Sequence, residues 1–454
     1  MTEQALRTGS HDLTPSAEFQ AAMARDWATS PLPGELLLPA ARFTPSRRAR
    51  LSARFPGERL MIPAGELRVR SNDCDYRFRP HSAYVWLTGL TGEDQAGHVL
   101  VLEPSGPNGH DAVLYVRPRS PRDDSEEFYR DRRYGEFWVG RRPDLGEVER
   151  MTGIPCAHLD ACGKLPPGRD ASHDAELASV LSELRLIKDA WEVDQLQLAV
   201  DHTASGFEDV VRALPRALSH PRGERWIEGV FGLRARSEGN GTGYDTIAAS
   251  GAHACVLHWI RNDGALDPQK LLLLDAGVET DSLHTADITR TLPLSGRFSF
   301  LQLQVYELVL AAQEAGMAAL RPGASFRDFH RAGMRVIAEG LAEWGILKSP
   351  EGDLHRRYTL CSSGHMLGLD VHDCAQARVD TYLDGVLEEG NVLTVEPGLY
   401  FQPDDETLPA ELRGIGVRIE DDLVITEDGA RLMSGALPRT PEGIESWMGA
   451  LLEG

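Results

Sequence analysis

The sequence lacks the features that mark a membrane protein, a disulfide-rich protein or a basic nucleic-acid-binding protein. None of its apolar runs approaches the roughly 18 residues that a transmembrane helix needs. Its six cysteines form no CxxC pair, so neither a disulfide framework nor a thiolate zinc site is indicated. Basic residues are in deficit: 47 Lys and Arg against 69 Asp and Glu give a net charge of −22, which argues against a nucleic-acid partner. No basic segment followed by an apolar run opens the sequence, so we expect no signal peptide and a cytoplasmic location.

The 454 residues allow two or three domains, and 42% hydrophobic and 26% charged residues are typical of a globular protein. Residues 1–55 are rich in Ala, Arg and Pro and predict an N-terminal extension with a helix or two. Between 59 and 116, short apolar runs separated by Gly and Pro predict strands: RLMIPAGE, YVWLTGL, HVLVLEP and AVLYVRP. A polar stretch rich in Pro, Gly and Asp then leads into a long helical pattern at 175–211. We therefore expect an α/β (α+β) protein with a smaller mixed N-terminal domain at 1–180 and a second domain at 181–454.

The second domain contains a weak internal repeat. Helical patterns at about 190–238 and 303–344 are each followed by strand-like segments: TIAASG, VLHWI, LLLLDAG and ADITRTL in the first half, and YTLCSSGHMLGLDVHD, NVLTVEPG and GVRIEDDLVIT in the second. One acid in each half stands two residues before a Gly, Asp275 in LLLLDAG and Glu396 in LTVEPG. A second acid follows in ADITRT and in RIEDD. The two halves are therefore expected to bring two pairs of acids to a common place.

Four acids within apolar, strand-like sequence predict a site for metal ions. A charge buried without a partner costs many kcal/mol, so something must neutralise it. The four carboxylates carry a formal charge of −4, which two divalent ions would cancel: Asp275, Asp287, Glu396 and Glu420. No group of Lys or Arg in these segments is large enough to do the same. With His365 the donor set is hard and rich in oxygen, which suits manganese, magnesium, cobalt or iron(II) better than a thiolate zinc site. Two ions roughly 3.5–4 Å apart activate water and polarise a carbonyl, so the predicted chemistry is hydrolysis.

Each residue alone also has an ordinary structural explanation. A lone Asp at a strand end usually belongs to a turn, and a lone His in a loop is usually only hydrogen-bonded. His258 in VLHWI and His372 in DVHD are of interest because each precedes an acid-bearing strand, one in each half. Arg418, two residues before Glu420, is expected to orient a carboxylate, and the alternative is a surface salt bridge that contributes little.

Four segments in a fixed order carry a resemblance to a known family. LLLLDAG to ADITRT, SSGHMLGLDVHD, LTVEPGLY and GVRIEDDLVIT resemble the aminopeptidase P and prolidase family, whose pita-bread fold is shared with methionine aminopeptidases. Residues 70–90, RSNDCDYRFRPHSAYVWLTGL, resemble the N-terminal domain of aminopeptidase P specifically. The resemblance covers most of the chain from about residue 35 onward. It implies a C-terminal pita-bread metallopeptidase domain behind the N-terminal one.

The resemblance also implies roles for the candidate residues. Five side chains would hold two divalent ions, usually Mn²⁺: Asp275 chelating one ion, Asp287 and Glu420 bridging both, and His365 and Glu396 completing the other. Glu396 would also accept the proton of the attacking water. His258 and His372 match histidines that hold the substrate carbonyl and the developing oxyanion through neutral N–H donors.

The activity implied is that of a metalloaminopeptidase that releases the N-terminal residue from peptides with proline in the second position. Xaa-Pro dipeptidase (prolidase) is a close alternative, separated by whether longer peptides are cleaved. A metal-free creatinase-like hydrolase and a peptide-binding relative without metals are more distant, because all five ligand positions are filled. The family's subunits associate near the active site, so we expect a homodimer or homotetramer with Asp73 near a substrate entrance. The alternative for Asp73 is a plain turn residue in SNDCD.

Two features depart from the family's pattern. Asp275 and Asp287 are twelve residues apart, one more than is common. We place the extra residue in the turn around ETDSLHT, because a shift within a strand would turn Asp287 to the opposite face. Cys361, four residues before His365, stands where the family often has a histidine near the proline pocket. We expect Cys361 close to the substrate, and the alternative is a buried packing cysteine.

Overall fold

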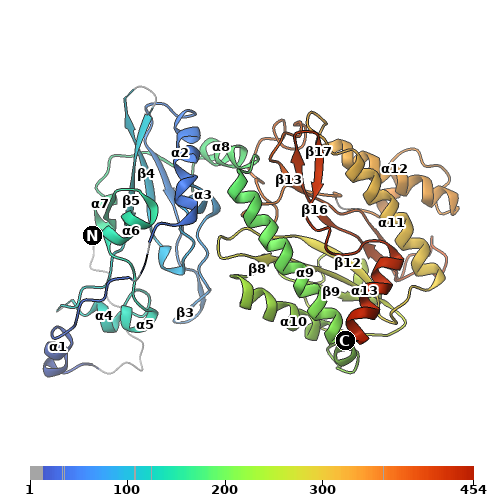
Figure 1. The fold of residues 1–454 in the computed structure, drawn as a ribbon, viewed down its shortest axis with the longest axis horizontal. Helices are drawn as coiled ribbons and strands as arrows, with labels where there is room; N and C mark the ends of the chain where they lie inside the picture. Colours follow the sequence, from blue (N-terminus) through green and yellow to red (C-terminus); the bar gives the residue numbers. More distant parts are fainter. Residues whose placement is uncertain are drawn as a thin grey trace. The chain divides into compact units, whose positions relative to one another are not determined.

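The computed structural model describes residues 14–32, 34, 36–106, 109–123, 125–360 and 362–453. The chain divides into two compact units, Met1–Leu181 and Ser182–Gly454. Figure 1 follows their elements along the chain from blue to red. Helix α8 (Ala175–Arg185) contains the boundary.

The first unit contains a five-stranded mixed sheet. Its strand order is β6-β5-β4-β1-β7, with antiparallel pairs in the middle and a parallel pair at each edge. Three of the predicted apolar runs form its long strands, in which Leu60, Leu100 and Leu114 are buried. The strands of this unit are β1 (Leu60–Pro63), β4 (Val99–Ser105), β5 (Gly109–Val116), β6 (Cys156–His158) and β7 (Arg169–Asp170), with a separate hairpin of β2 (Val69–Ser71) and β3 (Cys74–Asp75).

The fourth run, YVWLTGL, is helical, so its prediction as a strand was wrong. It belongs to α3 (Ser82–Thr88), whose seven residues are all buried. Without a polar face, an apolar run has no period that separates helix from strand. The helix ends at Gly89, which has a φ of 76° that favours glycine. The remaining helices before α8 are α1 (Ala17–Met23), η1 (Pro39–Arg42), α2 (Thr44–Ser52), η2 (Glu93–Gln95), α4 (Glu127–Arg130), α5 (Glu136–Val139), α6 (Leu145–Thr152) and α7 (Leu159–Cys162).

In the second unit, a pair of helices precedes a group of hydrogen-bonded strands twice, as the internal repeat predicts. Its helices are α9 (Ala190–Leu218), α10 (Gly223–Glu238), η3 (Gly251–Cys255), α11 (Phe300–Ala318), α12 (Arg327–Glu343), η4 (Leu354–Arg357) and α13 (Pro441–Glu453). The first half has strands β8 (Gly241–Thr242), β9 (Ile247–Ser250), β10 (Leu271–Ala276), β11 (Val278–Glu279) and β12 (Ile288–Pro293). The second has β13 (Val392–Val395), β14 (Gly398–Tyr400), β15 (Gly416–Arg418), β16 (Asp421–Thr426) and β17 (Gly429–Leu432).

The sheets of the second unit are small and antiparallel. Their orders are β12-β10-β9, β13-β16-β17, β11-β8 and β14-β15. Figure 1 shows the helix pair α9–α10 in green and the pair α11–α12 in yellow to orange. One hydrophobic core joins both pairs to the strands, and in it the rings of Phe207 and Phe231 meet edge to face at 6.1 Å. Buried Leu272 and Val305 belong to the same core.

The helical pattern predicted at 175–211 is interrupted. Helix α8 ends before residue 186 and α9 begins at Ala190. The break occurs because Asp189 caps α9: its side chain accepts a hydrogen bond from Glu192 N, and the Glu192 side chain accepts one from Asp189 N.

Two segments predicted as strands are loops. VLHWI (256–260) forms a turn after η3, and SSGHMLGLDVHD (362–373) is irregular apart from a single bridge between Met366 and Leu393. Both segments bury some apolar side chains, such as Trp259 and Leu367. A short buried run in a loop gives the same sequence pattern as a buried strand.

Candidate metal centre

The four acids reach the site from the ends of strands in both halves of the second unit. Asp275 lies in β10, opposite Thr289 of β12. Asp287 directly precedes β12, Glu396 directly follows β13, and Glu420 lies between β15 and β16. The turn of the first hairpin is at residues 281–283, where ETDSLHT places it. The structure thus brings the acids of the predicted repeat together.

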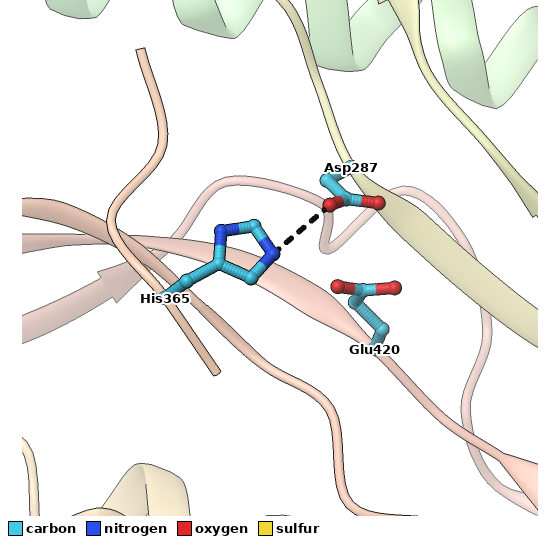
Figure 2. A group of neighbouring side chains, drawn as sticks. All are labelled: Asp287, His365 and Glu420. Carbon is cyan, nitrogen blue, oxygen red and sulfur yellow. Dashed lines mark ion pairs between the residues drawn. The ribbon is translucent and has the colours of Figure 1, made fainter. Parts of the chain in front are cut away.

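A cluster of three side chains is suited to hold a metal ion. One donor atom each of Asp287, His365 and Glu420 lie within 4.8 Å of one another. Figure 2 shows them converging from three separate segments, with the His365 Nε2 atom 3.2 Å from Asp287 Oδ2. Glu396 lies beside this cluster, since its Oε1 atom is 3.4 Å from His365 Nε2.

The His365 ring is oriented for ligation through Nε2. Its Nδ1 atom lies 3.0 Å from the carbonyl oxygen of Met366. A carbonyl can only accept, so Nδ1 carries the hydrogen and Nε2 is left to face the carboxylates. A ligating histidine is commonly fixed in this way by the hydrogen bond of its second nitrogen.

Arg418 orients Asp275 from inside the protein. Its Nη2 atom donates to Asp275 Oδ2 at 2.6 Å, and Nε donates to the hydroxyl of Thr289 at 3.1 Å. The Arg418 side chain is 4% exposed, so the alternative of a surface salt bridge does not apply. Thr289 in turn donates to Glu420 Oε2 at 2.6 Å. Arg418 and Thr289 therefore connect the carboxylates of the two halves.

Tyr244 is a site residue that the sequence did not indicate. Its hydroxyl lies 2.6 Å from Asp275 Oδ1 and 2.5 Å from Asp287 Oδ1, and it donates its one hydrogen to this pair. No pattern could have marked it, because its partners are 31 and 43 residues away. Asp422 was also missed: it follows Glu420 by two residues, and its Oδ2 accepts a hydrogen bond from Asp287 N at 3.1 Å.

Burial and mutual repulsion disfavour the charge on these acids. Burial raises the pKa of Asp275 to about 6, with Arg418 opposing the rise and Asp287 adding to it. Burial likewise raises the pKa of Glu396 to about 7 against the effect of His365. Burial and three neighbouring carboxylates raise the pKa of Glu420 well above its ordinary value. Such a group is stable in its charged form only when more positive charge is added.

The residues present fit divalent metal ions. Glu420 Oε1 and Asp422 Oδ1 are buried and have no hydrogen-bond partner within the described part of the chain. An orphaned carboxylate oxygen is costly in a buried place, and a cation supplies the missing partner. Carboxylates with one imidazole form a hard donor set. The predicted ligands are thus placed where ions could bind them.

A cavity of about 270 Å³ opens onto this cluster. Its wall includes His258 and His372, together with the apolar side chains of Leu257, Ile260 and Val371. The His372 ring meets the His365 ring edge to face, with centroids 4.5 Å apart. Burial and the neighbouring His365 lower the pKa of His372, which favours its neutral form. The cavity therefore combines the acids with two imidazoles and an apolar wall.

Two predicted residues do not belong to the described part of the second unit. Asp73 lies in the first unit, in the turn between β2 and β3, where its half-exposed carboxylate pairs with Arg132 at 2.9 Å. Cys361 lies outside the described residues. Across the described ranges, no helix combines the length and the apolar character needed to cross a membrane.

Two family models and several known proteins match the sequence of this chain. The sequence model of metallopeptidase family M24 matches residues 194–427, and that of the aminopeptidase P N-terminal domain matches residues 45–163. Xaa-Pro aminopeptidase 2 of Streptomyces coelicolor is 52% identical over 461 residues, which cover 96% of this chain and 97% of that protein. Xaa-Pro aminopeptidase 1 of the same organism is 51% identical over 479 residues, which cover 99% of this chain and 96% of that protein.

A solved structure shows the same fold. Aminopeptidase P from E. coli with the inhibitor Pro-Leu matches with a TM-score of 0.77 and 29% sequence identity, over 91% of this chain and 99% of that one. The predicted fold class is confirmed: a C-terminal pita-bread metallopeptidase domain follows a smaller mixed α/β domain. The resemblance to aminopeptidase P is confirmed as well. The chain belongs to metallopeptidase family M24 and carries the N-terminal domain of aminopeptidase P.

Proposed function

We propose that this protein is a metal-dependent aminopeptidase that releases the N-terminal residue from peptides with proline in the second position. The observation that carries the proposal is the 52% identity to a Streptomyces coelicolor Xaa-Pro aminopeptidase over 96% of the chain. The converging acids and imidazoles around the cavity support the same chemistry.

The proposed cofactor is a pair of divalent ions, with Mn²⁺ as the preferred metal. Asp275 would chelate one ion, Asp287 and Glu420 would lie between the two, and His365 and Glu396 would hold the other. The convergence of Asp287, His365 and Glu420 supports this assignment. The hard character of the donors favours Mn²⁺ over Zn²⁺.

When bound, the two ions supply positive charge that activates a water molecule and polarises the scissile carbonyl. The chain's own groups do the rest. Glu396, at the edge of the cluster, would accept the proton of the water. His258 and His372, on the cavity wall, would donate N–H groups to the carbonyl oxygen as negative charge develops on it.

Substitutions separate these roles. Asp287→Ala should lose both bound metal and activity, because it removes one of the carboxylates that would hold the ions. His258→Ala and His372→Ala should keep their metal and lose kcat by about 10²–10³, as for a lost oxyanion donor. Metal content measured by elemental analysis and kcat measured on the same samples test the assignment, and a histidine variant that loses its metal would show that it is a ligand.

Proline specificity requires a substrate test. Proline has no amide hydrogen and a fixed φ, so a bond before it suits a shaped pocket better than general backbone recognition. The test is hydrolysis of an Xaa-Pro dipeptide against an Xaa-Pro-Xaa tripeptide by enzyme refilled with Mn²⁺. Cleavage of the tripeptide supports the aminopeptidase, whereas cleavage of the dipeptide alone would identify a prolidase.

The assembly and location stay predictions. We propose a homodimer or homotetramer in which Asp73 lies near the substrate entrance of a neighbouring subunit. Light scattering of the active protein tests it, and a fully active monomer would refute it. Cell fractionation tests the cytoplasmic location. The position of Cys361 near the substrate is tested by the rate of thiol labelling with and without a substrate analogue.

A further inference from the structure

We propose that Glu224 is a positioning residue for the reaction: it fixes the loop of residues 251–264 and thereby holds His258 at the wall of the cavity. Glu224 lies in the first turn of α10 and is fully buried. The inference rests on the proposed role of His258 and extends it to a residue outside the cavity.

The Glu224 carboxylate accepts hydrogen bonds from four N–H groups of this loop and its ends. Oε1 accepts from Ser250 N at 2.8 Å and lies 2.7 Å from His253 Nδ1. Oε2 accepts from Trp259 Nε1 at 2.9 Å and from Gly264 N at 2.7 Å. Four donors fill the acceptor sites of a carboxylate.

Two of the four donors lie at the ends of the loop, and the other two lie within it. Ser250 ends β9, where the chain leaves the sheet, and Gly264 is where it returns to α10, since Glu224 N also donates to Gly264 O at 3.1 Å. His253 and Trp259 lie between them and stack with ring centroids 3.8 Å apart. One buried carboxylate thus binds both ends of the loop and two of its rings.

His258 depends on this loop for its direction. Within the described residues its ring forms no hydrogen bond, so the backbone around it fixes where it points. The next residue, Trp259, is 7% exposed and is held by Glu224. A misplacement of about 1 Å at a reacting group can cost roughly 100-fold in rate. If Trp259 is held less firmly, its neighbour His258 is therefore expected to move away from its position at the cavity wall.

Close packing leaves the carboxylate little freedom. A Cβ atom added at Gly264 would meet Glu224 Oε2 at 2.8 Å, so glycine is required for the loop to reach the carboxylate. Asn262 has a φ of 45° and braces the same loop, since its side chain accepts from Ala248 N at 2.9 Å and donates to Thr246 O at 2.8 Å. The loop is built to hold one conformation.

The test is a double-mutant cycle with metal-loaded enzyme. Glu224→Gln keeps the shape but replaces one acceptor oxygen by an NH₂ group that faces N–H donors. We expect it to retain metal, to lose kcat by about 10- to 100-fold with a smaller change in KM, and to speed hydrogen exchange in residues 250–264. The matched control is Glu238→Gln on the same helix, an exposed partner of Arg234 that should leave kcat unchanged.

The decisive variant combines Glu224→Gln with His258→Ala. If Glu224 acts through His258, the double variant has the kcat of His258→Ala alone. If the two losses multiply, Glu224 acts elsewhere and the inference fails while the role of His258 stands. If His258→Ala alone retains full kcat, both the proposed role of His258 and this inference fail. Should Glu224→Gln not fold, Trp259→Phe, which removes one donor, takes its place in the same cycle.

Discussion

Glu420→Gln should abolish stabilisation by metal while leaving the metal-free protein almost unchanged. Glu420 is 1% exposed, and burial beside three other carboxylates raises its pKa well above the ordinary value. Burial and repulsion thus disfavour the charge on this side chain when no metal is bound, and glutamine has a similar shape without the charge. The amide oxygen can still accept the hydrogen bond that Thr289 donates at 2.6 Å. With metal, the variant lacks a charge that the ions need.

The expected size of the effect follows from ligand linkage. Ions at 100 times their Kd add about 2.7 kcal/mol for each site, or about 5 kcal/mol for two. At roughly 2–4 °C per kcal/mol, Mn²⁺ should raise the Tm of the wild-type protein by on the order of 10–20 °C over the chelated form. Differential scanning calorimetry of both proteins, with chelator and with Mn²⁺, measures all four states. If chelated Glu420→Gln melts far below the chelated wild type, Glu420 is a structural residue and the reasoning is wrong.

Three further predictions concern groups around and beyond the metal centre. Tyr244→Phe removes the hydroxyl that orients two carboxylates and should cost about 10- to 100-fold in metal affinity or kcat, measured by metal titration and steady-state kinetics. Lys188→Met leaves the buried Asp373 with less compensation and should lower the free energy of unfolding by about 3 kcal/mol, measured in urea, since both side chains are 1% exposed and 3.0 Å apart. Burial raises the pKa of Glu147, but Arg141 and backbone N–H groups outweigh it and lower the pKa to about 2. Its stabilisation of the first unit should therefore be complete above about pH 4.5 and be lost as the pH falls toward 2, and Glu147→Gln should flatten that part of an acid unfolding curve.

The sequence predicted the acids because burial of charge leaves a visible pattern. Asp275 within LLLLDAG is conspicuous, since an acid rarely ends a strand of four leucines without a partner. The same logic places Glu396 and Glu420, and the structure brings these side chains together. By contrast, the strand predicted for YVWLTGL was wrong because a fully buried helix has no polar face for periodicity to detect.

Tyr244 and Glu224 could not be predicted because what matters in them is tertiary contact. Tyr244 lies in a polar turn, GTGYDT, and its importance comes from the carboxylates that its hydroxyl contacts in the folded protein. Glu224 stands in an ordinary amphipathic helix, where an acid near the N-terminus is common. Only the return of the loop at Gly264, 40 residues later, shows that this acid faces inward.

Hydrogen bonds between the two halves of the second unit explain why the site lies where the halves meet. Glu420 N donates to Thr289 O at 3.1 Å, and Thr291 Oγ1 donates to Arg418 O at 2.8 Å, so β12 of the first half is joined to the acid-bearing segment of the second. Arg290, 1% exposed, adds bonds to the carbonyl of Glu420 and to the carboxylate of Asp421. Each half alone would have to expose its acids or bury them unpaired, at a cost of several kcal/mol for each charge. Joined, they close a buried set of carboxylates whose remaining charge a pair of divalent ions can neutralise, which makes the chemistry of the centre a consequence of how the halves pack.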